Sequence, residues 1–312
     1  MVIPKSIIIF ITNKCDLDCR HCFVRKSSVE LNVKYIKKII NEVRPELVYL
    51  TGGEPFLHSQ FLEICKLLKK YNCSAKINTN GYNVKDIVNK CRKLKEIGLG
   101  FTLQVSLDGL RETHDFIRQC NSFDNALKTL KQASKFCDTE VLTVVNNYNW
   151  KELAELNKIL RKYNIKQNFE LIRGDPLDKN IKLPPLEKAY KIVKRIYQKE
   201  YSKPYTKFFQ AMYFRSACQA AKNKFISKCV VCEGRHISVV YANGDVALCE
   251  LVKPIGNIKG NSFLEIWNSK KANILRKGLS KCTCTHGCFL FPSIHNPKIM
   301  LKNAIQYYNP FD

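Results

Sequence analysis

The sequence predicts an α/β protein whose parallel sheet is built from repeated strand–helix units. Short runs rich in aliphatic and β-branched residues recur between positions 6 and 173. Each run is followed by a stretch with the 3.6-residue apolar period of an amphipathic helix. Apolar residues occupy 45% of the 312 positions, so the chain has the composition of a globular protein with a sizeable core. Strands that are joined by helices and buried on both faces form a parallel sheet.

Six strands are expected in this repeating region. They are residues 6–12, 47–51, 74–79, 100–106, 140–145 and 168–172. The segments between them carry single apolar stripes, for example Val33, Ile36, Ile40 and Val43, which predict one covering helix per strand. Six repeats fit either an open doubly wound sheet or a partial (β/α)6 TIM-like barrel, and periodicity alone leaves both open.

Beyond residue 175 the pattern changes. The stretch 175–185 contains three prolines and is typical of a linker, and 186–197 carries one more amphipathic helical stripe. Two apolar runs, 237–241 and 246–249, then flank Asn243-Gly244, which predicts a β-hairpin. We therefore expect three regions: a barrel core over 1–175, a linker and helical segment over 176–217, and a small Cys-rich domain over 218–312.

Charge and cysteine content narrow the class of protein. The chain has 52 Lys and Arg against 27 Asp and Glu, a net charge of +25. Because these residues are spread along the chain, a solvated basic surface is the first interpretation, with an anionic substrate, RNA or a membrane face as alternatives. The longest aliphatic or aromatic run is five residues, 7–11, and no export signal is seen, so we expect no transmembrane segment and a cytoplasmic location. In that compartment fifteen cysteines favour metal or redox ligation over disulfides.

Three cysteines follow the first strand in a compact pattern. Cys15, Cys19 and Cys22 form CxxxCxxC at the carboxyl end of the strand, where a barrel keeps its chemistry. Such a loop can bind three irons of a [4Fe-4S] cluster and leave the fourth iron without a protein ligand. Zinc is the competing interpretation. It is disfavoured because structural zinc sites use two separated Cys pairs and the next cysteine is Cys65.

A second motif makes the pattern specific. Thr51-Gly52-Gly53-Glu54-Pro55 ends the second strand, and together with the cysteine triplet it resembles the radical S-adenosylmethionine (radical SAM) enzymes. The resemblance implies the partial barrel. It also implies that the amino and carboxylate groups of SAM chelate the open iron, with the backbone around Gly52, Gly53 and Glu54 meeting the amino group. Two glycines allow main chain to approach a ligand closely, and a carboxylate beside them can accept from an ammonium.

Polar residues end the third and fourth strands, where ligand-facing groups belong. Asn78 is placed in the cofactor site on that basis. The segment 106–118 resembles one that, in peptide- and protein-modifying members, supplies a Ser hydroxyl to the SAM ribose and an Arg to its carboxylate, which implies these roles for Ser106 and Arg118. The alternative for Arg118 is a surface salt bridge. His114 is interpreted as structural, and Cys65, Cys91 and Cys137 as helix-core residues.

The C-terminal cysteines resemble the SPASM pattern, or its shortened twitch form. Cys232, eleven residues, Gly244, four residues and Cys249 match it, and the run closes at Cys282, Cys284 and Cys288 with fewer cysteines than a full SPASM domain. The resemblance therefore implies one auxiliary [4Fe-4S] cluster, held by Cys232, Cys249, Cys288 and either Cys282 or Cys284. Cys218 or Cys229 could replace one ligand, and a zinc knuckle is the alternative.

The function implied is reductive cleavage of SAM to a 5′-deoxyadenosyl radical, with a reductant protein such as flavodoxin or ferredoxin as partner. A C-terminal cluster favours net oxidation or crosslinking of a small metabolite or a peptide. The first strand starts at Ser6, which leaves no room for a preceding leader-peptide domain and lowers the expectation of a peptide. A tRNA-modifying enzyme of the same family remains an alternative. A zinc-containing nucleic-acid-binding protein is disfavoured, because basic residues and aromatics are not concentrated in one stripe. The sequence assigns no catalytic side chain.

Overall fold

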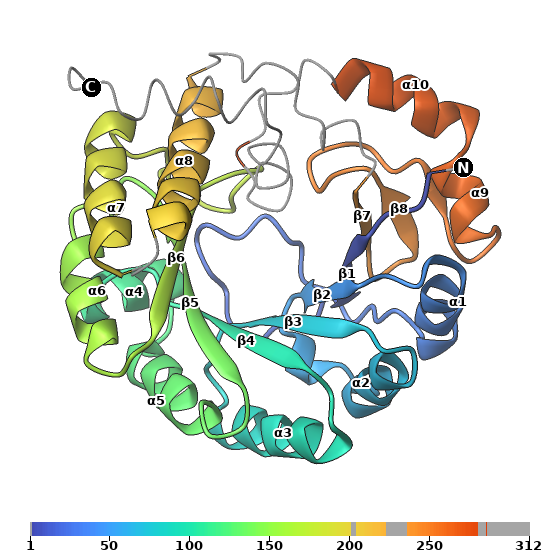
Figure 1. Ribbon diagram of the computed structural model, residues 1–312, viewed down its shortest axis with the longest axis horizontal. Coiled ribbons are helices and arrows are strands. Elements are labelled where there is room, and N and C mark those ends of the chain that lie inside the picture. The colour runs from blue at the N-terminus through green and yellow to red at the C-terminus, as the bar shows by residue number, and fades with distance from the viewer. Residues whose placement is uncertain (1, 201–203, 223–235, 280–284, 286–312) are drawn as a thin grey trace.

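The protein folds around one strongly curved sheet covered by helices on its outer face (Figure 1). The computed structural model describes residues 2–200, 204–222, 236–279 and 285. Within these residues the strand order is β6-β5-β4-β3-β2-β1-β7-β8-β9. Across the same residues, no helix combines the length and apolar character needed to cross a bilayer.

The first six strands are parallel and follow one another around the sheet. Their bounds are β1 Ser6–Thr12, β2 Leu47–Gly52, β3 Ser74–Thr79, β4 Phe101–Ser106, β5 Asp138–Val145 and β6 Lys166–Leu171. The aliphatic run of β1 is buried on both faces: Ile7 and Ile9 join the core beneath the helices, while Ile8 and Phe10 face the concave side. The predicted α/β partial barrel is thereby confirmed.

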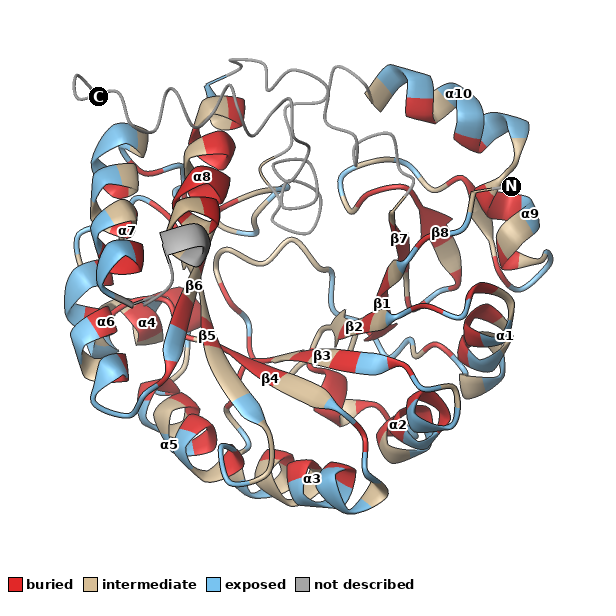
Figure 2. Cartoon of the chain, in the orientation of Figure 1, coloured by how far each residue is buried: buried red, intermediate tan, exposed pale blue. Residues whose placement is uncertain are grey.

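Amphipathic helices cover the convex face of this sheet, with buried stripes turned inward and exposed residues outward (Figure 2). They are α1 Val33–Val43, α2 Phe61–Lys70, α3 Val84–Ile97, α4 Arg111–Arg118, α5 Phe123–Ala133 and α6 Leu153–Arg161, with a short 3-10 helix, η1, at Pro55–Leu57. Local capping sets several of their ends. Asn32 and Asn83 accept backbone hydrogen bonds at the starts of α1 and α3, and Gly98 ends α3 with a φ of 74°.

The predicted hairpin is present and extends the barrel sheet. β7 Ile237–Val240 pairs in parallel with β1, and β8 Asp245–Ala247 and β9 Gly256–Asn257 continue antiparallel from it. Gly244 has a φ of 93° in the turn before β8, a conformation that glycine adopts without strain. The described part of the Cys-rich region therefore shares the barrel's sheet.

Further helices lie near the two ends of the sheet. α7 Leu186–Glu200 and α8 Pro204–Ala221 pack together against β6, and their core includes Phe169, Val193 and Phe214. At the other edge, α9 Phe263–Trp267 contacts α1 and is followed by α10 Lys270–Leu279. The predicted linker also contacts the barrel loops, since Lys182 accepts a backbone hydrogen bond from Asn147. Domain boundaries at 175 and 217 stay a prediction.

Because α9 shares the barrel core, its central aromatic residue should matter to the stability of the whole chain. Trp267 is fully buried, and the guanidinium of buried Arg276 lies 4.7 Å from its ring centroid. We expect Trp267→Ala to lower the free energy of unfolding by about 3–5 kcal/mol, because it leaves a large cavity. Urea denaturation would measure this. The exposed Ile274→Ala on α10 is the control and should cost under about 1 kcal/mol. Equal midpoints for the two variants would contradict a shared core.

Candidate active site

The concave side of the sheet encloses one large cavity. Its volume is about 850 Å³, and it is lined by inward-facing side chains of the strands and by the loop after β1. Interiors of complete TIM barrels are filled by branched apolar side chains. Here polar side chains line much of the wall: Tyr49, Thr51, Lys76, Asn78, Gln104, Ser106, Glu140, Lys166, Asn168 and Glu170. A cavity of this size whose wall carries polar groups indicates a ligand site.

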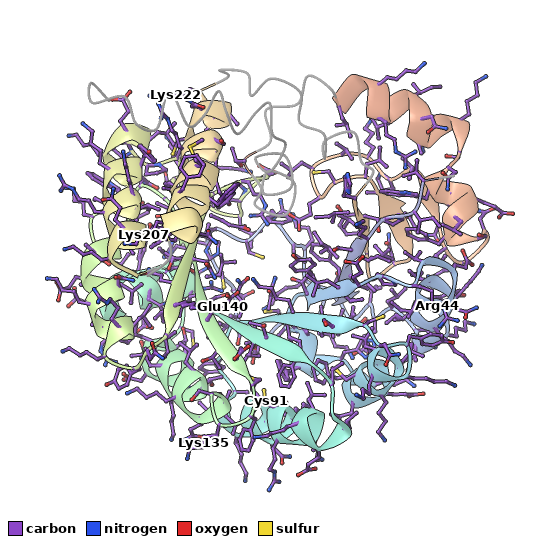
Figure 3. The ribbon with its side chains drawn as sticks, viewed as in Figure 1. Arg44, Cys91, Lys135, Glu140, Lys207 and Lys222 are labelled. Atoms are coloured by element: carbon purple, nitrogen blue, oxygen red, sulfur yellow. The ribbon has the colours of Figure 1, made fainter. Side chains whose placement is uncertain are left out.

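Ion pairs and hydrogen bonds order part of this wall. Lys76 forms an ion pair with Glu140, and Gln104 Nε2 donates to Glu140 Oε1 over 2.6 Å. Figure 3 shows Glu140 inside the curve of the sheet, whereas Cys91 and Lys135 lie in the helical layer outside it. The placement of Cys65 and Cys91 in the core agrees with their interpretation as small hydrophobic residues.

The loop after β1 brings the cysteine triplet to the cavity. Cys15, Cys19 and Cys22 all line it; Cys19 is buried and the other two are half-buried. The loop is closed at its base, where Asn13 donates to the backbone of Val29. Burial raises the pKa of Cys15 to about 12 and also raises that of Cys19. These thiols are therefore neutral in the protein alone and become thiolates when a metal group replaces their protons.

The donor set fits an iron–sulfur cluster. In the described ranges, no three His, Cys, Asp or Glu side chains are gathered closely enough to hold a single metal ion. Each cysteine of a [4Fe-4S] cubane binds a different iron, so its ligands need not converge on one point. Arg118 also places a fixed positive charge beside the loop, since its Nη1 lies 3.6 Å from Cys19 Sγ. That charge favours thiolate sulfur.

Gly52 and Gly53 line the cavity, but the need for glycine there comes from the chain itself. A Cβ at Gly52 would lie 2.1 Å from the carbonyl oxygen of Thr12, and one at Gly53 would lie 2.1 Å from that of Lys14. The backbone N–H groups of Gly53 and Glu54 donate to these same oxygens over 2.8 and 2.7 Å. The close approach seen here is between β2 and the cysteine loop, and the approach of the same backbone to a ligand stays a prediction.

Glu54 also has a structural use that the sequence did not indicate. Its buried carboxylate accepts hydrogen bonds from Phe56 N, Thr79 Oγ1 and Asn80 N, so it joins the end of β2 to the end of β3. Burial raises the pKa of Glu54 to about 7. Because its oxygens accept three hydrogen bonds from the protein, this carboxylate fixes the loop after β2 against the loop after β3. That the same carboxylate also accepts from a ligand ammonium stays a prediction.

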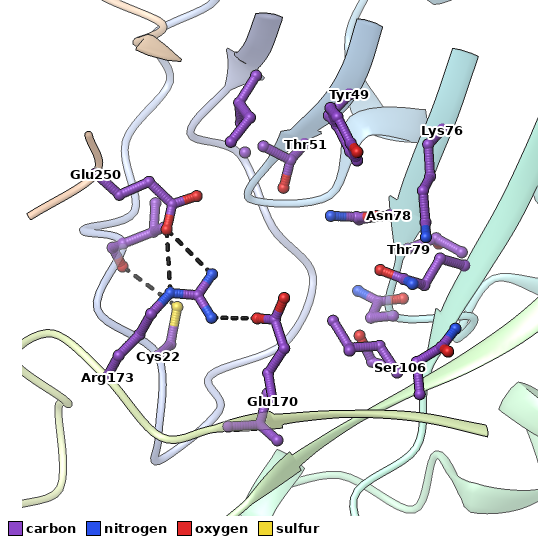
Figure 4. Close-up of a pocket in the computed structure, with 18 of the residues that line it drawn as sticks. Cys22, Tyr49, Thr51, Lys76, Asn78, Thr79, Ser106, Glu170, Arg173 and Glu250 are labelled. Atoms are coloured by element: carbon purple, nitrogen blue, oxygen red, sulfur yellow. Dashed lines mark hydrogen bonds and ion pairs between the residues drawn. The ribbon is translucent and has the colours of Figure 1, made fainter. Parts of the chain in front are cut away.

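Asn78 and Ser106 line the cavity at the ends of β3 and β4. Figure 4 shows them on the wall that faces Cys22 and Arg173. The buried Oδ1 of Asn78 has no hydrogen-bond partner among the described residues. A buried acceptor without a partner is costly, so this atom is suited to a ligand donor.

Arg118 is held in a buried ion pair and is not on the surface. Its Nε and Nη2 lie 2.8 and 2.6 Å from Asp108 Oδ2. Burial alone would raise the pKa of Asp108, but the charge of Arg118 and other contacts, among them the hydrogen bond from the backbone of Val144, together outweigh it and the pKa is lowered. His114 Nδ1 accepts from the backbone of Asp108, and burial lowers the pKa of His114 to about 3, so its ring is neutral. These contacts support the structural interpretation of His114.

Sequence reasoning missed a buried ion network at the end of β6. Arg173 contacts Glu170 on one side and Glu250 on the other, with Arg173 Nη2 and Glu250 Oε2 separated by 3.0 Å (Figure 4). Its guanidinium also lies 5.9 Å from the ring of Phe23. Phe23 directly follows Cys22, and Glu250 directly follows Cys249. The position of Arg173 just after a strand could have marked it as a site residue. Nothing in the sequence indicates that its partner is Glu250, 77 residues later.

Only Cys218 and Cys249 of the C-terminal cysteines lie within the described residues. Cys249 is buried just after β8, close to the barrel edge. Cys218 is buried in α8, where its Sγ lies 3.7 Å from the carbonyl oxygen of Leu186 and burial raises its pKa to about 12. The other predicted ligands and alternatives, Cys229, Cys232, Cys282, Cys284 and Cys288, lie outside the described residues.

Comparison with known proteins identifies two regions of the chain. A sequence model of the radical SAM superfamily matches residues 9–166, and one of the SPASM iron–sulfur cluster-binding domain matches residues 229–289. The first match contains the cysteine triplet and the Gly-Gly-Glu segment. The second contains the hairpin.

Two relatives each match about half of this chain. Fe-coproporphyrin III synthase of Methanosarcina barkeri is 29% identical over 52% of this chain and 42% of its own length. Mycofactocin maturase MftC of Mycolicibacterium smegmatis is 29% identical over 49% and 41%. The chain thus matches about two-fifths of the length of each.

A solved structure shows the same fold over almost the whole chain. SuiB of Streptococcus suis aligns with a TM-score of 0.69 at 17% identity, covering 93% of this chain and 74% of that one. The superfamily implies a [4Fe-4S] cluster and SAM, and the SPASM domain implies auxiliary iron–sulfur binding. The chain belongs to the radical SAM superfamily and carries a SPASM domain in its C-terminal region.

Proposed function

We propose that this protein is a radical SAM enzyme that cleaves SAM reductively and removes hydrogen from a substrate held in the barrel cavity. One observation carries the proposal: the cysteine triplet and the polar ends of β2, β3 and β4 line a single cavity. When bound, the cluster and SAM supply the radical chemistry through a 5′-deoxyadenosyl radical. The chain's own residues bind, orient and shield these groups.

In this proposal Cys15, Cys19 and Cys22 bind the radical cluster. The N–H groups of Gly53 and Glu54 are already donated to Thr12 and Lys14. An ammonium group of SAM would therefore meet backbone carbonyl oxygens in this segment, which have the matching polarity. The glycines keep that backbone close to the cysteine loop.

Three further side chains have assigned roles in SAM binding. Asn78 offers its unpartnered Oδ1, and Ser106 offers a hydroxyl for the ribose. Arg118 is suited to the carboxylate of SAM. Asp108 holds its Nε and Nη2, which turns Nη1 toward Cys19 and so toward the cluster loop. The buried Asp108–Arg118 pair fixes the guanidinium before any ligand arrives.

We assign one auxiliary [4Fe-4S] cluster to the C-terminal region. Its ligands would be Cys232, Cys249, Cys288 and either Cys282 or Cys284. The burial of Cys249 at the end of the hairpin supports its place in this set. Cys218 is a weaker candidate, because its thiol is turned into the α7–α8 core and lies near a backbone carbonyl.

The substrate is proposed to be a small metabolite or a peptide that undergoes net oxidation or crosslinking. MftC is named a maturase, and SuiB has been crystallised with its precursor peptide SuiA, which supports a peptide. The synthase of M. barkeri supports a smaller molecule. The volume of the cavity is within the usual range of about 300–1,000 Å³ for ligand pockets. It therefore suits SAM together with a small polar substrate or one side chain of a peptide. The electron donor would be a flavodoxin or ferredoxin.

The cysteine triplet provides the first test. Replacing Cys15, Cys19 or Cys22 with Ala should abolish dithionite-dependent formation of 5′-deoxyadenosine, because three thiolates are needed to hold the cluster. Anaerobic reconstitution followed by chromatography of the nucleoside products measures this. Cys120→Ala, just beyond α4, is the matched control and should retain activity. If a variant with all three of these cysteines replaced still cleaved SAM, the assignment would be wrong.

The glycine contact provides a second test. Gly53→Ala places a methyl group 2.1 Å from the Lys14 carbonyl, so the cysteine loop must move. We expect the iron content of the radical site to fall and SAM affinity to fall with it, by about tenfold if the shift costs about 1.4 kcal/mol. Gly100→Ala is the control, because a Cβ there meets no atom within 4 Å. Normal iron content with weak SAM binding would show instead that Gly53 serves the ligand directly.

The auxiliary cluster provides a third test. Changing Cys232 and Cys249 to Ala together should reduce iron from about eight to about four per chain, the content of a single cubane. SAM cleavage without substrate should survive, whereas substrate turnover should be lost. Cys218→Ala should leave the iron content unchanged because its thiol is in the helical core. Full iron in the double variant would rule out these ligands.

A further inference from the structure

An exposed apolar patch lies on the loops at the carboxyl end of the barrel. Phe116 on α4, Tyr148 after β5 and Leu177 after β6 are 41%, 39% and 44% exposed, high values for such side chains. The rings of Phe116 and Tyr148 are 5.1 Å apart. Arg20 joins the two sides of this docking patch: its guanidinium lies 4.3 Å from the Phe116 ring centroid, and its Nη1 lies 3.1 Å from Asp178, the neighbour of Leu177.

The docking patch rests directly on the cysteine loop. Arg20 lies between Cys19 and Cys22 in the sequence. Its N–H donates to the carbonyl of Ile117 over 2.8 Å, and Leu177 N–H donates to the carbonyl of Cys22 over 3.0 Å. The end of α4 is therefore one backbone hydrogen bond from the residue after Cys19. Leu177 is one backbone hydrogen bond from Cys22 itself.

We infer that this patch is the docking surface for an acidic protein that carries a one-electron redox centre. The inference rests on the proposed function, because only a reducible cluster in this loop needs such a donor. In the transfer, one electron leaves the reduced donor and enters the oxidised cluster, and no bond or proton has to move. Electron-transfer rates fall steeply with distance, so a donor gains most by binding where the loop reaches the surface.

Charged side chains of both signs surround the patch, and the net charge of the whole chain favours an acidic partner. Arg25 and Lys179, 61% and 65% exposed at their side chains, share the single carboxylate of Asp175 near Leu177. Lys26 adds a further cation paired with Asp18. The whole chain carries a net charge of +25, so its long-range field attracts an acidic protein and repels a second copy of itself.

The apolar side chains at the centre of the patch supply binding energy that charge alone does not. Partly exposed aromatic residues surrounded by charged groups are typical of residues that dominate binding energy at protein interfaces. Leu177 lines the edge of the barrel cavity, but Phe116 and Tyr148 do not, so the two rings are available to a partner while substrate occupies the cavity. The patch thus combines an aromatic centre, a rim of paired charges and direct contact with the cysteine loop, on a chain whose net charge is strongly positive.

The test uses the reconstituted holoenzyme and a reduced bacterial flavodoxin as the probe. Stopped-flow absorbance follows cluster reduction by flavodoxin and, separately, by dithionite, and calorimetry at low salt measures the binding of oxidised flavodoxin. Phe116→Ser with Tyr148→Ser should weaken binding and slow reduction by flavodoxin at least about tenfold, and leave reduction by dithionite unchanged. Tyr163→Ser, with a similar 46% exposure on the loop after α6, is the matched control and should alter neither rate.

A charge variant tests the rim independently. Arg25→Glu with Lys179→Glu should lower the association rate with flavodoxin and flatten its salt dependence, with dithionite reduction intact. Equal flavodoxin rates for the wild type and both double variants would overturn the inference, as would loss of substrate turnover with unchanged flavodoxin reduction. Absence of SAM cleavage by the dithionite-reduced wild type would instead contradict the proposed function.

Discussion

The close contact between the loop after β1 and the end of β2 is the constraint on which the site depends. Two backbone hydrogen bonds, from Gly53 to Thr12 and from Glu54 to Lys14, join these segments where no side chain could fit. The same segment then fixes β3 through the Glu54 carboxylate. Three successive strand ends are therefore held by one short peptide. The cysteine loop is positioned by main-chain geometry, which is less adjustable than side-chain packing.

Buried charges form a second level of organisation around this frame. Asp108 and Arg118 are paired below the cysteine loop, and Arg173 is enclosed by Glu170 and Glu250. Buried ion pairs add little net stability because desolvation opposes their attraction, but removing one partner is costly. Their effect is to restrict the arrangement of the chain. Arg173 does this across 77 residues of sequence, joining the end of β6 to the segment just after Cys249.

Much of the architecture follows from local sequence. The aliphatic run at Ile7–Ile11 and the recurring helical stripes gave strands whose bounds differ from the observed ones by at most two residues, because burial period and strand length are local properties. The triplet and Gly-Gly-Glu segment located the site for the same reason. Long-range partners could not be read in this way. The parallel pairing of β7 with β1 and the use of the Glu54 carboxylate depend on contacts that no spacing encodes.

The pairing of β7 with β1 has a consequence for how the chain folds. Ser6 is in register with Ile237, so the first strand to be synthesised obtains its second neighbour only after more than two hundred further residues. During that interval β1 can pair with β2, which leaves five consecutive Ile and Phe residues on an open sheet edge. Such a segment has the β-propensity and lack of charge that promote pairing with other chains. The nascent protein therefore passes through a stage in which an apolar strand that is later interior lies at an open, aggregation-prone edge.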